Sequence, residues 1–146
     1  MSIPHPTTYK GLPFLFKDWA LLRPDQLFEE KGLEGLVNHY KALSQERGIE
    51  IPLPESVLNE LGYEFMRREK TKDAVTIFKA ATDRYPVSPN AWDSLGDAYE
   101  AQKDLSQALA SYQKAVKLAE EQSHSNLSYF QQNLQRLQQQ ITPDQN

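Results

Sequence analysis

Apolar residues recur at three- and four-residue spacing through most of the chain, and this spacing predicts helices. The two clearest runs are Leu58, Leu61 and Phe65, and then Trp92, Leu95 and Tyr99. Each run forms an apolar stripe along one face of a helix, with polar positions between its members. We therefore expect an all-α fold in which each helix buries one face against its neighbours.

The two stripes belong to two copies of one longer pattern. Aligning the copies on Gly62 and Gly96, which lie 34 residues apart, places similar side chains at equivalent positions. The equivalent pairs are Leu61 and Leu95, Phe65 and Tyr99, Ala74 and Ala108, Phe78 and Tyr112, and Ala81 and Ala115. Self-similarity at this period is typical of stacked helical hairpins. One hairpin cannot bury its apolar surface alone, so other segments must cover both ends of the stack.

The two copies resemble the tetratricopeptide repeat. The family pattern places Trp, Leu-Gly and Tyr on a first helix and a small-aromatic-small series on a second. In this chain it falls on Trp92, Leu95, Gly96, Tyr99, Ala108, Tyr112 and Ala115. The first copy has Leu58 in place of the Trp but ends at the expected Pro86, whereas the second copy has Glu120 in place of that proline. The resemblance implies a right-handed superhelix of antiparallel helix pairs.

Further helices are predicted on both sides of the repeats. Pro24 suits the first position of a short helix to about Lys31, and a second amphipathic helix should end at Gly48. Near the other end, one more apolar stripe consists of Leu127, Phe130, Leu134, Leu137 and Ile141. Its remaining faces are nearly all Gln and Asn, as expected of a capping helix with one face on the last repeat. A coiled-coil dimer helix is the alternative interpretation.

These patterns divide the chain into four parts. Residues 1–53 should be an N-terminal helical segment with a linker helix, and 55–122 should be two repeat units, 55–88 and 89–122. Residues 123–141 should form the capping helix and 142–146 a tail. Within the repeats, the expected helix N-caps are Thr71, Ser88 and Asp104.

Composition narrows the possible functions. The net charge is -4 with no basic patch, which argues against a nucleic-acid partner. No apolar run approaches the ~20 residues of a membrane-spanning helix, and the absence of cysteine excludes disulfides and thiolate metal sites. A Gly-x-Ser-x-Gly elbow, a glycine-rich phosphate loop and His-Glu-x-x-His are all missing. We therefore expect no catalytic residues, no cofactor and no metal in this chain.

The beginning of the chain has a second resemblance. Ser2-Ile3-Pro4, Tyr9, Gly11-Leu12 and Leu15-Phe16 are similar to the stretch that follows the catalytic histidine in bacterial α/β-hydrolase esterases related to siderophore esterases and esterase D. The resemblance implies that the chain is the C-terminal part of a larger serine hydrolase whose catalytic residues lie outside it. The apolar cluster of Phe14, Phe16 and Trp19 would then be a domain-contact patch, or a surface for homodimers. The compartment, cytoplasmic or periplasmic, stays open.

The tetratricopeptide resemblance also implies a concave face lined by the first helix of each unit. The family's groove positions fall on Ser56, Asn59, Tyr63, Met66 and Arg67, and then on Asn90, Asp93, Asp97, Glu100 and Ala101. The three acids would repel an acidic chain terminus, so the expected partner is a basic or neutral protein segment or peptide. Two alternatives remain: the acids keep a helix face soluble, or the repeats are a structural appendage that docks on or dimerises the hydrolase domain without a separate ligand.

Overall fold

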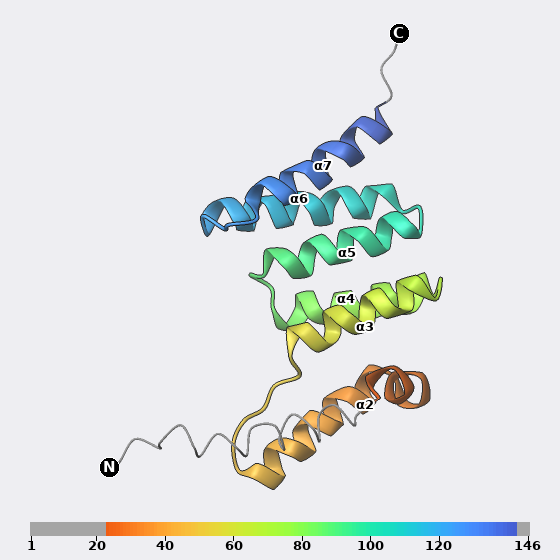
Figure 1. Cartoon of the computed structure of the whole chain (residues 1–146), viewed down its shortest axis with the longest axis vertical. Coiled ribbons are helices and arrows are strands. Elements are labelled where there is room, and N and C mark those ends of the chain that lie inside the picture. Colours follow the sequence, from red (N-terminus) through yellow and green to blue (C-terminus); the bar gives the residue numbers. More distant parts are fainter. Residues whose placement is uncertain (1–22, 143–146) are drawn as a thin grey trace, which may run out of the picture.

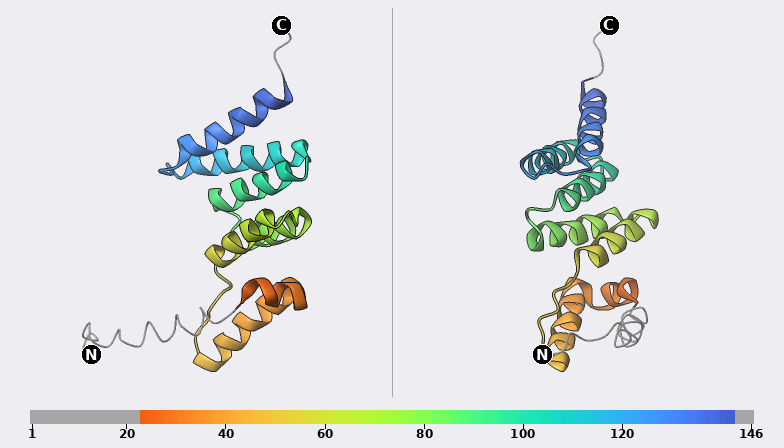
Figure 2. Two further views of the ribbon diagram at one scale, coloured as in Figure 1. Left: turned by 45° about the vertical axis from the view of Figure 1, so that its right-hand side comes forward. Right: turned by 60° about the vertical axis from the view of Figure 1, so that its left-hand side comes forward.

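The protein is represented by a computed structural model that describes residues 23–142. Within these residues it contains six α-helices and no strand, which confirms the all-α prediction. The helices are α2 (Pro24–Arg47), α3 (Glu55–Arg67), α4 (Thr71–Arg84), α5 (Pro89–Ala101), α6 (Leu105–Glu121) and α7 (Leu127–Ile141). They follow one another in a single stack, with α2 at one end and α7 at the other (Figure 1). The same order is seen from two other sides in Figure 2.

The helix α2 consists of two helical pieces joined at Gly32, where φ is 65° and ψ is -164°. The sequence predicted two helices here, and their outer ends are where it placed them. Pro24 is the first helical residue, and Gly48 closes the helix in the left-handed region with φ at 66°. Glycine adopts this conformation at no steric cost, which is why it ends helices so often.

The junction between α2 and the first repeat is aromatic and framed by ion pairs. The ring of Phe28 meets that of Phe65 edge to face, with centroids 5.2 Å apart. Beside it, the Arg68 guanidinium lies 3.1 Å from Asp25 and 3.5 Å from Glu29. Ion pairs as exposed as these contribute about 0–1 kcal/mol each. Burial of Phe28, which is 8% exposed, therefore contributes more than these ion pairs to holding α2 on α3.

The units α3–α4 and α5–α6 repeat each other in backbone as well as in side chains. Each first helix ends in a turn whose second residue is left-handed, Glu69 (φ 60°) in one unit and Lys103 (φ 66°) in the other. The amide of Lys70 donates to Phe65 O at 2.9 Å, and the amide 34 residues later, at Asp104, donates to Tyr99 O at the same distance. The 34-residue period of the sequence is thus a period of the hydrogen-bonded backbone.

Two of the three predicted helix N-caps are confirmed. Ser88 Oγ accepts the amide of Ala91, and Asp104 Oδ1 accepts the amide of Gln107. The prediction for Thr71 was wrong, because Thr71 is the first residue of α4 and Lys70 occupies the cap position without a side-chain hydrogen bond. Lys70 lies 34 residues before Asp104, so the repeat itself sets the start of α4 one residue earlier.

Within each unit the two helices cross where an aromatic ring lies on a glycine. Phe78 of α4 packs on Gly62 of α3, and Tyr112 of α6 packs on Gly96 of α5; both rings are fully buried. A Cβ placed on Gly96 would lie 2.6 Å from two carbons of the Tyr112 ring, closer than real Cβ atoms come to a neighbour. The two helices of each hairpin therefore approach closely at the glycine.

The last helix, α7, uses its apolar stripe against α6. Phe130 packs with Val116 and Ala119, and Leu137 packs in the cluster around Ala108 and Tyr112. The residues on the outer side of α7 are exposed, and most are glutamine. The stripe from Leu127 to Leu137 is thus covered by α6, whereas Ile141 is 39% exposed and the opposite face meets solvent.

The crossing at Gly96 gives a test of the packing. Gly96→Ala should lower the free energy of unfolding by roughly 1–2 kcal/mol, because a buried ring leaves no room for the methyl group and this cost exceeds the gain in helix propensity of about 1 kcal/mol. Urea unfolding followed by circular dichroism measures the change.

The matched control is Gln113→Ala at an exposed position of α6, which should leave the stability unchanged or slightly higher. A Gly96→Ala protein as stable as the wild type would contradict the close crossing.

Candidate functional site

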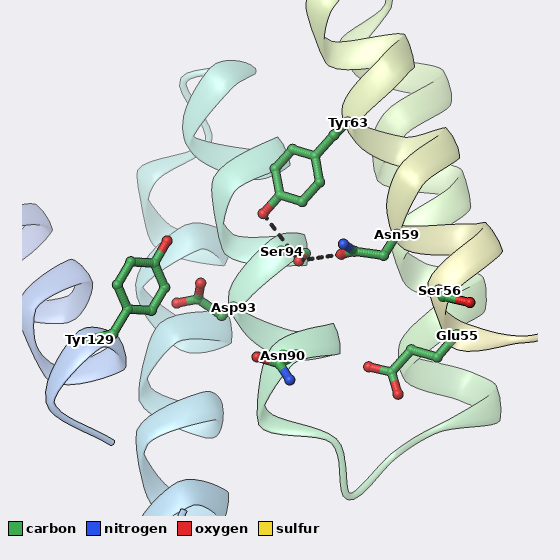
Figure 3. A pocket seen from close by; sticks show the side chains of 8 residues that line it. All are labelled: Glu55, Ser56, Asn59, Tyr63, Asn90, Asp93, Ser94 and Tyr129. Carbon is green, nitrogen blue, oxygen red and sulfur yellow. Dashed lines mark hydrogen bonds between the residues drawn. The ribbon is translucent and has the colours of Figure 1, made fainter. Parts of the chain in front are cut away.

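The first helices of the two units and the last helix together line an open groove of about 450 Å³. Its walls come from α3, α5 and α7 (Figure 3). The lining residues are Glu55, Ser56, Asn59, Tyr63, Asn90, Asp93, Ser94 and Tyr129. All of them are polar or carry a polar end, two are carboxylates, and none is a cation. The groove therefore offers hydrogen-bond acceptors and negative charge to whatever enters it.

The wall formed by α3 and α5 follows from the repeat. Asn59 and Tyr63 stand one turn apart on the same side of α3, and α5 presents its equivalent residues beside them. The Ser94 hydroxyl of α5 donates to Asn59 Oδ1 at 2.9 Å (Figure 3). The Tyr63 ring packs edge to face on Phe78, with centroids 5.1 Å apart. Tyr63 thus joins the wall to the core of the first hairpin.

Asp97 is enclosed by tyrosine hydroxyls. The Tyr63 hydroxyl donates to Asp97 Oδ2 at 2.7 Å, and the Tyr112 hydroxyl lies 2.5 Å from Oδ1. Burial, together with the neighbouring Asp97 carboxylate, raises the pKa of both tyrosines. These tyrosines therefore stay protonated as donors, and Asp97 ties α3, α5 and α6 together.

Glu100 is held by the last helix. Arg136 of α7 contacts it in a bidentate arrangement, with nitrogen–oxygen distances of 2.6 and 2.8 Å. The Tyr112 hydroxyl lies 2.9 Å from the same carboxylate. The hydrogen bonds from Arg136 lower the pKa of Glu100 despite its burial. The charge of Glu100 is therefore compensated within the chain.

Asp93 differs from the other two acids of α5. Its side chain lies in the wall of the groove, yet the residue is only 3% exposed. Asn133 of α7 donates one amide group to both carboxylate oxygens, at 3.0 and 3.2 Å. Burial raises the pKa of Asp93 to about 7, and the nearby Asp97 adds to the shift while Asn133 and Arg136 oppose it. Asp93 is thus a buried carboxyl group whose hydrogen-bonding partner is uncharged.

The structure brings together five of the ten positions predicted for the groove: Ser56, Asn59, Tyr63, Asn90 and Asp93. The other five, Met66, Arg67, Asp97, Glu100 and Ala101, do not line it. Met66 packs at the edge of the core, and Arg67 is exposed beside Glu64. A role of any of the ten in partner binding stays a prediction. The predicted contact patch of Phe14, Phe16 and Trp19 lies outside the described residues.

Three lining residues were missed by the sequence analysis. Glu55 is the first residue of α3 and Ser94 follows Asp93, so both adjoin positions that were predicted. Tyr129 comes from α7, whose stripe does not continue the 34-residue register of the two units. Had α7 been treated as a third groove-lining helix, its exposed aromatic residue would have been the obvious candidate.

Between residues 23 and 142 no three His, Cys, Asp or Glu side chains are placed to hold a metal ion. Over the same range no helix has the length and apolar character needed to cross a bilayer. A second hollow of about 440 Å³ lies between α2, the 49–54 connector and the end of α4, and Tyr40 and Leu53 are among its lining residues.

Comparison with known proteins agrees with the repeat pattern. Residues 59–123 match the family model of the tetratricopeptide repeat. This segment, which spans most of α3 to α6, is therefore similar to tetratricopeptide repeats. The chain is also 35% identical, over 60 residues, to the tetratricopeptide repeat domain-containing protein PYG7, chloroplastic, of Arabidopsis thaliana. That similarity covers 41% of this chain and 20% of the relative, so the chain matches about a fifth of the relative's length.

The environment of Asp93 predicts that the stability of the protein depends on pH. Because its folded pKa of about 7 exceeds the ordinary 3.8, the folded protein binds this proton more tightly than the unfolded chain does. Stability from Asp93 is therefore full at low pH and is lost as the pH rises from about 4 through 7. Relative to Asp93→Asn, the wild type should lose roughly 2–3 kcal/mol between pH 5 and pH 8.

Urea unfolding of both proteins across this pH range measures the difference, and Asp83→Asn at an exposed position of α4 is the control. If the wild type and Asp93→Asn change in parallel with pH, Asp93 does not experience the burial described here.

Proposed function

We propose that the chain is a non-catalytic module that binds a segment of another protein in the groove of α3, α5 and α7. Tetratricopeptide repeats generally mediate protein–protein interactions and are typically non-catalytic. The proposal rests on the groove itself. In the part of the chain that the structure describes, this groove is open, and polar side chains of three helices line it. Concave faces of stacked repeats are the surfaces such proteins use for binding.

The size and chemistry of the groove favour a peptide-like partner of basic or neutral character. A hollow of about 450 Å³ accommodates a few side chains, so a short segment fits it better than a folded domain. Glu55 and Asp93 place negative charge in the wall, and no lysine or arginine lines it. An acidic chain terminus would meet repulsion there without a compensating cation.

Each part of the chain has a place in this proposal. The units 55–88 and 89–122 supply two walls of the groove, and residues 123–141 cap the stack while adding Tyr129 to the lining. At the opposite end, α2 covers the first unit.

A structural role is the second candidate, in which the repeats dock on or dimerise a serine hydrolase domain and bind no separate ligand. It rests on the similarity of residues 2–16 to bacterial esterases and on the apolar cluster of Phe14, Phe16 and Trp19. The tetratricopeptide match begins at residue 59 and does not bear on that similarity. The genomic sequence upstream of Met1 tests this candidate: a histidine directly before Met1, preceded by a hydrolase domain, would support it.

The binding module is tested with peptides selected on the full chain from a random library displayed on phage. Asn90 lies exposed in the groove wall, so the larger side chain of Asn90→Trp should fill the hollow. The affinity for the selected peptides, measured by fluorescence anisotropy, should fall by about tenfold or more.

Gln113→Trp on the exposed face of α6 adds the same side chain outside the groove and should leave the affinity unchanged. Equal weakening by both variants, or by neither, would place binding elsewhere and count against the proposal.

A further inference from the structure

We propose that Asp93, Glu55 and Tyr129 form a subsite for one basic side chain, lysine or arginine, of the bound polypeptide. This inference rests on the proposed function and specifies what the groove recognises.

The first element of the subsite is a buried acid without a cationic partner. The carboxylate of Glu100 is bound by Arg136, and that of Asp97 is held by two tyrosine hydroxyls. Asp93 is the most deeply buried acid of the groove wall, and its side-chain hydrogen bonds come from the neutral amide of Asn133 alone. A buried carboxylate is costly unless it is paired, so an incoming cation would relieve an existing penalty.

The second element is a carboxylate on the facing wall. Glu55 begins α3 and accepts a hydrogen bond from the Ser88 hydroxyl. In Figure 3, Glu55 and Asp93 come from opposite walls of the hollow, and Asn90 lies between them. A basic group in this space lies between two negative charges, with the Asn90 amide oxygen as a further acceptor.

The third element is an aromatic flank. Tyr129 of α7 lies on the Asp93 side of the groove (Figure 3) and is 54% exposed. Lysine and arginine both combine a long apolar stem with a charged end, and such stems pack on aromatic faces. Tyr129 therefore suits the stem of the same side chain whose charged end reaches Asp93.

Both basic residues meet this chemistry because each carries a positive charge and N–H donors on a long stem. Glutamine brings N–H donors but no charge to balance Asp93, and glutamate brings repulsion. Serine is too short to present its donor at a buried carboxylate from the mouth of the groove, and ionised aspartate has no donor.

The subsite should also make binding depend on pH. A basic side chain binds ionised Asp93, and the pKa of Asp93 in the free chain is raised to about 7. The groups that interact with Asp93 are Asp97 on α5, Tyr63 on α3, and Asn133 and Arg136 on α7, and Glu55 lies in the facing wall. Because arginine and lysine keep their charge throughout, affinity should rise by up to about tenfold from pH 6 to pH 8.

The experiment compares peptide selections on the wild-type chain and on Asp93→Asn. Wild-type selections should be enriched in lysine or arginine at one position, and Asp93→Asn selections should lose this enrichment. Replacing that residue by glutamine in the best peptide should weaken binding to the wild type by tenfold or more, and should change binding to Asp93→Asn much less. Anisotropy at pH 6 and pH 8 supplies the pH dependence.

Two further measurements make each outcome decisive. Circular dichroism melts establish whether Asp93→Asn is folded. Glu55→Gln, at the more exposed carboxylate, is an independent variant that should also weaken binding of the basic peptide. Peptides that lose binding on Asn90→Trp but show no basic preference would overturn the subsite while the proposed function stands. If no peptide binds in a groove-dependent way, the proposed function fails and the subsite fails with it.

Discussion

The contact between an aromatic ring and a helix glycine sets the geometry of both hairpins. Phe78 rests on Gly62 and Tyr112 rests on Gly96, in each case with no space for a side chain on the glycine. This contact fixes how closely the two helices of a unit approach and at which point they cross. Because the crossing is the same in both units, α3 and α5 present the same face in the same direction, and their polar residues meet along one groove.

Tyr112 connects this packing to the concave face. Its ring belongs to the crossing with Gly96, while its hydroxyl reaches the carboxylates of Asp97 and Glu100. Two acids on the polar side of α5 are therefore structural, since Asp97 joins three helices and Glu100 fixes α7 through Arg136. From the sequence, these acids are interpreted either as keeping a helix face soluble or as repelling an acidic ligand. Neither interpretation includes this internal role. Asp93, the third acid of α5, lies beside the open groove, and its hydrogen-bonding partner Asn133 is not a cation.

The fold could be predicted almost entirely from the spacing of side chains. The 34-residue period located both hairpins, and residues such as Ser88 and Gly48 located helix ends, because these features depend on local sequence. The missed cap at Thr71 and the left-handed residues Glu69 and Lys103 share one cause. The repeat imposes the same turn on both units, although neither copy has glycine there.

The groove could be predicted only in part. Positions on α3 and α5 follow from the repeat, but the partners of the α5 acids come from α7, which does not follow the period. Nothing in the sequence alone indicates that Asn133 would reach Asp93, or that Arg136 would reach Glu100, because such contacts depend on how α7 lies across the stack.

The one-sided character of α7 determines where the array can be lengthened. Its apolar stripe already packs on α6. Its outer side is mostly glutamine, which provides little apolar surface for packing against another hairpin. A unit spliced between Gln122 and α7 could present α7 with a new second helix in place of α6, provided that the residues under Phe130 and Leu137 are copied into it. An engineer who wished to extend the concave surface would therefore insert before the capping helix and leave α7 as the final layer.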